Sequence, residues 1–193
     1  MTDKPPRRDE IVPDVDHPAH ARTKPLLRHR RRPPVGPLQV LAAWLGAFLG
    51  IALVAAMVEV LPRLHLLVIG SFGASAVLLY GAPRAPFSQP RNLIGGHLIS
   101  ALVGVACFKY LPDVAVLKEA MAVATAIALM VATHTIHPPG GATALIAVIG
   151  PPAVHDLGWG YVFPVLTGAV LMLFVALISN NLYQRGSYPD RWD

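Results

Sequence analysis

The sequence predicts an all-α membrane protein, a polytopic transmembrane helical bundle built from two repeats. Hydrophobic residues make up 54% of the 193 residues, only 14% are charged, and the mean hydropathy is +0.51. The charge is also uneven, since residues 1–37 hold nine of the 16 Lys and Arg. The remaining chain lacks the charged surface that a soluble domain of this size needs. We therefore expect a membrane domain rather than a soluble enzyme.

The chain divides into a tail, a membrane domain and a short C-terminal end. Residues 1–37 are polar and rich in proline, which predicts a disordered, basic, cytoplasmic tail. Residues 38–184 form the predicted transmembrane domain, and residues 185–193 a short tail. Arg28 and the run of three arginines at 30–32 stand just before the first apolar segment. Such residues favour the cytoplasmic side and contact anionic lipids, so we expect both termini in the cytoplasm and no nucleic-acid partner.

Apolar runs define the predicted helices. Four are long enough to cross a hydrocarbon core of about 30 Å, namely residues 38–61, 93–111, 117–135 and 160–182. Two shorter segments contain or follow glycine breaks, namely residues 64–80 and 142–150. Three prolines predict a loop at 81–92, and the His-Pro-Pro-Gly-Gly sequence at 137–141 predicts that a new helix starts at about Ala142.

An internal match supports the two-repeat interpretation. Gly73 to Leu78 matches Gly141 to Ile146 at a constant offset of 68 residues, and the same offset joins Pro83 to Pro151. Each half then consists of a long helix, a Gly-broken short segment and a second long helix. If the short segments cross, the chain has six spans and inverted repeats. If they are re-entrant, it has four full spans and parallel repeats, and the distribution of Lys and Arg does not decide between the two.

Small residues recur at a spacing of four, which lets helices approach closely in lipid and also permits a homo-oligomer. The sets are Gly46 and Gly50; Gly96, Ser100 and Gly104; and Ala120, Ala124, Ala128 and Ala132.

The densest group of polar residues surrounds the second glycine break. Two prolines after His137 disfavour helix there, while Gly140 and Gly141 let the backbone approach a bound group. The new helix would begin at about Ala142, next to Thr143, and a helix N-terminus attracts anions. His134 lies three residues before His137, so the two side chains share a face if the helix continues. We expect these five residues to bind a small anion, with the imidazoles donating hydrogen bonds or protons.

The first half supplies matching candidates. Gly73 and Ser75 occupy the corresponding short segment, and Arg84 and Arg91 lie in the loop that follows. A guanidinium group presents a fork of donors suited to small oxyanions such as nitrite, nitrate or a carboxylate. The alternative role for the arginines is contact with lipid phosphates.

Other chemistries remain open or are disfavoured. A metal site would need further ligands, for which His65, His97 and Glu59 are the available residues, so we assign no metal. The alternative role for the histidines is to cap free carbonyls. No nucleophile elbow or phosphate-binding loop is present in the sequence. We therefore expect no enzymatic activity and no cofactor.

Three motifs resemble those of the HPP family of integral membrane proteins: His137 to Leu145, Gly73 to Ala76, and Gln89 to Asn92. The resemblance covers about residues 38–184. It implies four membrane segments and an association with nitrite transport, and it marks His137, Pro138 and Pro139 as signature positions without assigning them a mechanism.

The sequence therefore predicts a multi-pass transporter or channel of the bacterial inner membrane for a small inorganic anion, with nitrite favoured. The alternatives are a non-transporting membrane scaffold or sensor and, less strongly, a divalent-metal transporter.

Overall fold

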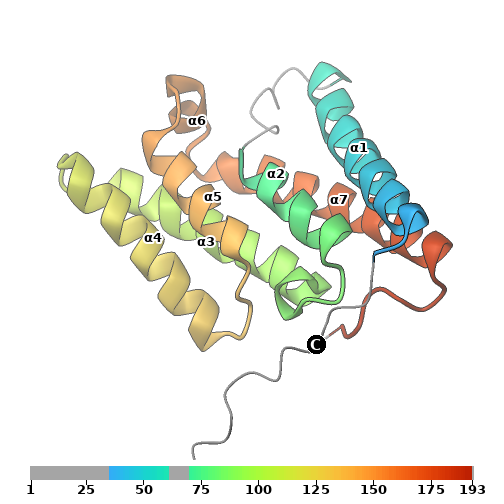
Figure 1. Cartoon of the computed structure of the whole chain (residues 1–193). Coiled ribbons are helices and arrows are strands. Elements are labelled where there is room, and N and C mark those ends of the chain that lie inside the picture. Colours follow the sequence, from blue (N-terminus) through green and yellow to red (C-terminus); the bar gives the residue numbers. More distant parts are fainter. Residues whose placement is uncertain (1–34, 61–69, 193) are drawn as a thin grey trace, which may run out of the picture. The chain divides into compact units, whose positions relative to one another are not determined.

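The computed structural model describes residues 35–60 and 70–192, and these form a bundle of helices without strands. The predicted tail up to residue 34 and the start of the second segment, which includes His65, lie outside the described residues. Figure 1 shows how the long helices and the short ones are arranged. The long helices are α1 (Pro37–Val60), α3 (Pro90–Tyr110), α4 (Ala115–Ala132) and α7 (Val162–Tyr183). The short ones are α2 (Gly70–Ala76), a π-helical turn (Val77–Gly81), α5 (Pro138–Ile149), α6 (Pro152–Leu157) and 3-10 turns at Pro86–Ser88 and Gly158–Tyr161.

Three stretches of the described chain are long and apolar enough to cross a membrane: Pro37–Met57, Pro90–Tyr110 and Pro152–Tyr183. They coincide with three of the four predicted long spans. The fourth, α4, has 18 residues and is about 27 Å long at 1.5 Å per residue, and its crossing stays a prediction. The short helix α5 has 12 residues, or about 18 Å.

One end of the bundle gathers the start of α1, the loop before α3 and the end of α7. These three segments line a common cavity of about 650 Å³, whose lining includes Gln39, Arg84, Asn180, Gln184 and Ser187. We call this the arginine end, because Arg84, Arg91, Arg185 and Arg191 all belong to these segments or their immediate neighbours. The C-terminal tail is tied to it, since the Asp190 backbone N–H donates to Gln89 Oε1 at 2.9 Å.

The described helices alternate in direction relative to this end. α1, α3 and α5 begin at the arginine end, and the π-helical turn, α4 and α7 finish there. The end of α4 lies there because Arg91 contacts Thr133, and the start of α5 lies there because His137 contacts Phe87 in the loop before α3. Figure 1 accordingly shows α2 and α5 running in opposite directions beside each other. The first half thus runs opposite to the second, although a true duplication stays a prediction.

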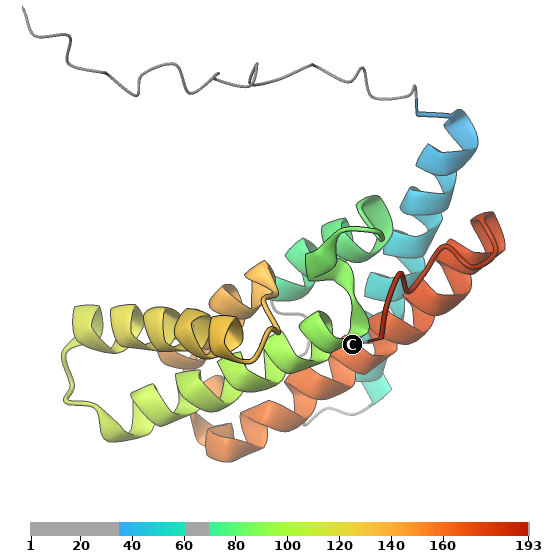
Figure 2. The ribbon, with the colours of Figure 1, turned by 90° about the horizontal axis from the view of Figure 1, so that it is seen from below.

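Helix α3 is the central element of the core. Figure 2 shows it between α4 and α7, and it also packs against α5. Glycine permits the closest approach, because a Cβ on Gly104 would lie 2.5 Å from the Ala144 carbonyl oxygen of α5. The predicted packing role of the small residues spaced by four is therefore confirmed for α3. It is wrong for α4, whose Ala120, Ala124, Ala128 and Ala132 are exposed while Ala122 and Ala126 are buried.

The helix after the second glycine break begins earlier than predicted. α5 starts at Pro138 rather than near Ala142, with extended backbone at His137 (φ −133°). Proline suits a first helical turn, where its missing N–H would have had no helical partner. The two prolines therefore start α5. The predicted loop at 81–92 is also shorter, because α3 already begins at Pro90.

Candidate functional site

A group of buried polar side chains lies where α2, α3 and α5 meet. It consists of Ser71 and Ser75 of α2, His97 of α3, His137 just before α5, and Thr143 of α5. Each of the five is 0% exposed. Buried polar groups inside a membrane domain are costly unless they are paired, so their concentration at one point makes this place the candidate functional site. We call these residues the histidine–hydroxyl cluster.

Ser75 connects the two histidines. Its Oγ lies 2.8 Å from His137 Nε2 and 3.0 Å from His97 Nε2. The two imidazole rings are close, with centroids 4.9 Å apart. Side chains from three separate elements thus converge on one hydroxyl group.

The outer ring nitrogens have partners as well. His97 Nδ1 lies 2.9 Å from Thr143 Oγ1, and His137 Nδ1 lies 2.8 Å from the Phe87 carbonyl oxygen. Thr143 Oγ1 is also 3.0 Å from Ser71 Oγ. All four imidazole nitrogens are therefore engaged, and the chain of contacts runs from α5 through α3 and α2 to the loop before α3.

One arrangement of the hydrogens pairs all four ring nitrogens when both imidazoles are neutral. The Phe87 carbonyl can only accept, so His137 donates from Nδ1 and accepts at Nε2. The Ser75 hydroxyl has one hydrogen, which goes to His137, so Ser75 accepts from His97 Nε2–H. His97 Nδ1 then accepts from Thr143. The two histidines are thus assigned opposite tautomers, and every hydrogen points from Thr143 toward Phe87.

The internal match places Ser75 and Thr143 at equivalent positions, and the structure gives them equivalent contacts. Each hydroxyl reaches the carbonyl four residues earlier, that of Ser71 at 3.1 Å and that of Pro139 at 3.4 Å. Each also contacts His97, one at Nε2 and the other at Nδ1. His97 is consequently held between the corresponding residues of the two short helices.

The cluster is closed by tight packing. A Cβ on Gly96 would lie 2.5 Å from His137 Cβ, and one on Gly140 would lie 2.7 Å from Ser100 Oγ. The Phe72 ring meets His97 edge-on with centroids 5.3 Å apart. The structure therefore represents a state in which the cluster is shut off from solvent.

The predicted pairing of His134 with His137 is wrong. α4 ends at Ala132, and His134 adopts the left-handed conformation (φ 56°) with its side chain exposed. The turn between the two histidines is not helical, so they do not share a face. The partner of His137 is instead His97, 40 residues earlier in the chain.

The other predicted site residues separate into two groups. Ser75, Thr143 and Gly140 belong to the cluster or its wall, as described above. Gly73 is exposed on α2 with open space beside it, and Gly141 is half-buried with only Val123 near, so neither meets the cluster.

The two predicted arginines lie at the arginine end and outside the cluster. Arg84 is exposed and lines the cavity there. Arg91 is exposed as well, and its Nη2 donates to the Thr133 carbonyl oxygen at 3.0 Å, so it caps the end of α4. They are positioned beside the cavity or the helix end and make no contact with the histidines.

Sequence reasoning did not select His97 and Ser71 for the anion site. The available signal for His97 was its position as a polar residue inside a predicted span, a feature that usually marks function. Ser71 had no such signal, because a serine in an apolar helix commonly bonds its own backbone. The predicted metal alternative is not supported within the described ranges, where no three His, Cys, Asp or Glu residues come together as ligands.

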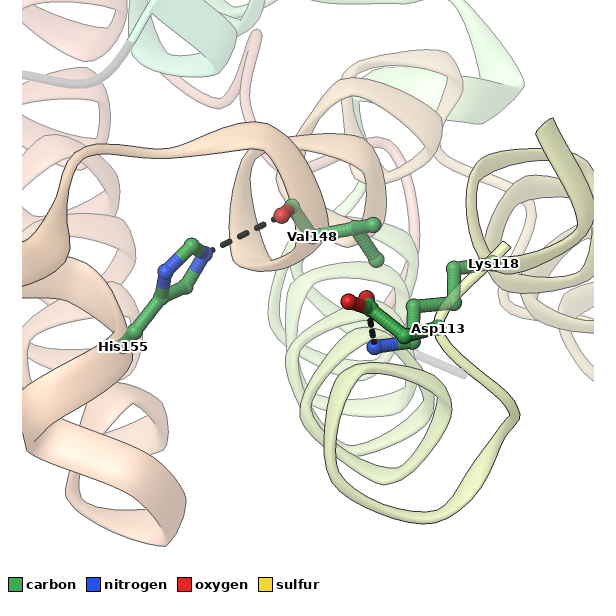
Figure 3. Close-up of polar contacts among 4 residues, drawn as sticks. All are labelled: Asp113, Lys118, Val148 and His155. Atoms are coloured by element: carbon green, nitrogen blue, oxygen red, sulfur yellow. Dashed lines mark hydrogen bonds and ion pairs between the residues drawn. The ribbon is translucent and has the colours of Figure 1, made fainter. Parts of the chain in front are cut away.

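Polar contacts of a different kind occur at the opposite end, where α3 and α5 finish. Lys118 Nζ pairs with Asp113 Oδ1 at 2.9 Å, and His155 Nε2 lies 3.0 Å from the Val148 carbonyl oxygen, as Figure 3 shows. The Phe108 ring is stacked on His155, and its centroid lies 5.1 Å from Lys118 Nζ. These contacts tie α3, α4 and α6 together at this end, which we call the lysine end.

Comparison with known proteins identifies the family. The family described as HPP, transmembrane region, matches residues 32–189. The chain belongs to the HPP family. A transmembrane protein of Dictyostelium discoideum is 43% identical over 172 residues, which cover 84% of this chain and 59% of that protein. A second one from the same organism is 42% identical over 156 residues, covering 78% and 50%. The chain thus spans about half to three-fifths of these curated relatives, and no solved structure matches it.

The His-Pro-Pro motif of this HPP-family chain can now be assigned structural roles. His137 joins the cluster, and Pro138 and Pro139 form the first turn of α5. Among the other motif residues, Gln89 holds the loop and the C-terminal tail through Pro83, Ala85 and Asp190. The resemblance seen in the sequence is confirmed, and the chain is a transmembrane protein.

Proposed function

We propose that this HPP-family protein transports a small inorganic anion, with nitrite favoured, and that the anion passes through the histidine–hydroxyl cluster. The observation that carries the proposal is the convergence of two histidines and three hydroxyls, all 0% exposed, between two short helices. Short or interrupted helices in corresponding halves are typical of transporter binding sites. Imidazole and hydroxyl groups supply the N–H and O–H donors that an oxyanion needs.

Two features support a cluster that opens during transport. The five-residue turn that follows α2, Val77–Gly81, is π-helical, a geometry frequent at functional sites. On the other side, His134 carries strained left-handed backbone in the connection that leads to His137. Both short helices thus adjoin irregular backbone at the arginine end, where a shift would expose Ser75 and His137.

The cavity of about 650 Å³ at the arginine end is the proposed entrance. Its lining includes residues 82–85, and the same loop carries Phe87, the hydrogen-bond partner of His137. Arg84 would raise the local concentration of anions there. The cavity is therefore connected through one short loop to the last residue of the hydrogen-bond chain.

Replacing Arg84 by glutamine is expected to raise the KM for nitrite about two- to fivefold and to leave kcat nearly unchanged, because a surface charge acts on encounter and is screened by salt. The measurement is nitrite uptake at 20 and 200 mM salt, with the difference between variant and wild type shrinking at high salt. Arg185→Gln is the matched control, since Arg185 is exposed at the same end and does not line the cavity. Equal effects of the two substitutions would assign the attraction to net charge alone.

We further propose six crossings with inverted halves, in a bacterial inner membrane with both termini in the cytoplasm. The alternating helix directions and the shared position of Arg84 and Arg185 support this arrangement. In a Cys107→Ala background, cysteines placed at Arg84 and Arg185 are expected to react with an impermeant thiol reagent from one side, and a cysteine at Lys109 from the other. Labelling of the first two positions from opposite sides contradicts six crossings and favours four.

The transport proposal is tested with purified protein in liposomes. Nitrite entry faster than into protein-free liposomes of the same lipid is the expected result. Entry at the protein-free rate, with the protein shown to be folded and inserted, would overturn the proposal.

A further inference from the structure

We infer that the histidine–hydroxyl cluster takes up one proton together with the anion, so that transport is an electroneutral proton–anion cotransport. This inference rests on the proposed function, because it concerns how the same site carries an anion.

The cluster holds no permanent charge. Within the described chain, the titratable groups around the two imidazoles are the imidazoles themselves and the Tyr161 hydroxyl. The Tyr161 hydroxyl donates to the Thr143 carbonyl oxygen at 3.1 Å. α2 contributes Ser71, Ser75 and Phe72, α3 contributes His97 itself, and the loop contributes the Phe87 carbonyl. Arg91 is occupied at the Thr133 carbonyl. No described Asp, Glu, Lys or Arg contacts either ring.

The hydrogen bonds can nevertheless accommodate one added proton. When a proton binds to His137 Nε2, that nitrogen donates to Ser75, and the Ser75 hydroxyl turns to the Ser71 carbonyl oxygen at 3.1 Å. When it binds to His97 Nδ1, the Thr143 hydroxyl turns to Ser71 Oγ at 3.0 Å. In both cases every ring N–H keeps an acceptor. A second proton would place two positive rings with centroids 4.9 Å apart, so the capacity is one.

Charge balance then couples the proton to the anion. A lone imidazolium or a lone anion at 0% exposure and without a counter-charge carries a large desolvation cost. The two together are neutral as a pair, and the cost of burying them is much smaller. The proton comes from water on the side of anion entry, forms an N–H bond on one imidazole, and leaves to water on the far side with the anion. The imidazole is regenerated neutral, and no redox step is involved.

The test uses proteoliposomes with an internal pH dye and a membrane potential set by potassium and valinomycin. After subtraction of the rate in protein-free liposomes, which measures passive leakage of nitrous acid, we expect one proton to enter per nitrite. The initial rate is expected to change less than twofold between 0 and −100 mV. An anion that moves alone works against about 2.3 kcal/mol at −100 mV, which corresponds to about a 50-fold ratio of its concentrations on the two sides of the membrane.

The outcomes separate the inference from the proposed function. Nitrite flux that follows the membrane potential and carries no proton overturns the coupling and leaves anion transport intact. No flux above the protein-free rate overturns both.

Variants test the role of the cluster in coupling. Ser75→Ala removes the link between the two histidines and is expected to lower the coupled rate at least tenfold, whereas Ser75→Thr keeps a hydroxyl and retains coupling. Ser179→Ala is the matched control, because the Ser179 hydroxyl lies outside the cluster and has no partner in the described part of the chain. Nitrogen-15 NMR of the histidine rings is an independent readout, with Nε2–H expected on His97 and Nδ1–H on His137. Identical tautomers on both, or full coupling in folded Ser75→Ala, would overturn the inference.

Discussion

Gly104→Ala is expected to destabilise the bundle by about 1–3 kcal/mol, which is the usual cost of overpacking. The added Cβ would lie 2.5 Å from the Ala144 carbonyl oxygen and 2.7 Å from Ala147 Cβ. Both are parts of α5 that cannot rotate away, so α3 and α5 must separate. The measurement is the unfolding midpoint of the purified protein in detergent, which should fall by roughly 2–10 °C.

Gly73→Ala is the matched control for this prediction. It makes the same chemical change in α2, but nothing lies within 4 Å of the added Cβ. Its midpoint is expected to stay the same or to rise slightly, because alanine favours helix over glycine. A Gly104→Ala protein as stable as wild type would contradict the close approach of α3 to α5.

His137→Gln is expected to lower the initial rate of nitrite transport about 10- to 100-fold. The substitution removes the ring that joins Ser75 to the Phe87 carbonyl. Unmade hydrogen bonds at buried groups cost about 1–3 kcal/mol each, and 1.4 kcal/mol corresponds to a factor of ten. Glutamine keeps a hydrogen-bond donor and an acceptor at this position, so the protein should still fold. Size-exclusion chromatography checks the fold alongside the flux.

His134→Asn provides the control for His137→Gln. His134 lies three residues away, is exposed and has φ 56°, a backbone conformation that asparagine tolerates. We expect transport within twofold of wild type. Equal losses of transport in the two variants would instead support a site formed by His134 and His137, as the sequence alone suggested.

Much of the fold was predictable from the sequence because lipid imposes simple rules. An apolar run such as residues 38–61 becomes a long helix, α1 (Pro37–Val60), since every backbone polar group must be satisfied within the segment. The start of α5 at Pro138 was not predicted. Two consecutive prolines suggest a break, and their other common role, in the first turn of a helix, depends on what precedes them.

The candidate site was predictable only in part. Ser75, His137 and Thr143 stood out through the internal match and the glycine break, and the structure brings them together. His97 completes the cluster from another helix, and no spacing rule relates it to His137 because the contact depends on how α3 packs against α5. Short-range patterns favoured His134, whose position depends on where α4 ends.

The most direct test of the central claim is whether nitrite protects the cluster from chemical modification. In a Cys107→Ala background, Ser71→Cys places a thiol at the edge of the cluster and leaves Ser75 and both histidines intact. Because position 71 is 0% exposed, modification by a small thiol reagent should be slow and limited by opening of the cluster. We predict that nitrite slows it further, in proportion to occupancy of the site. A modification rate that nitrite leaves unchanged, in a protein that still transports nitrite, would contradict passage of the anion through the cluster.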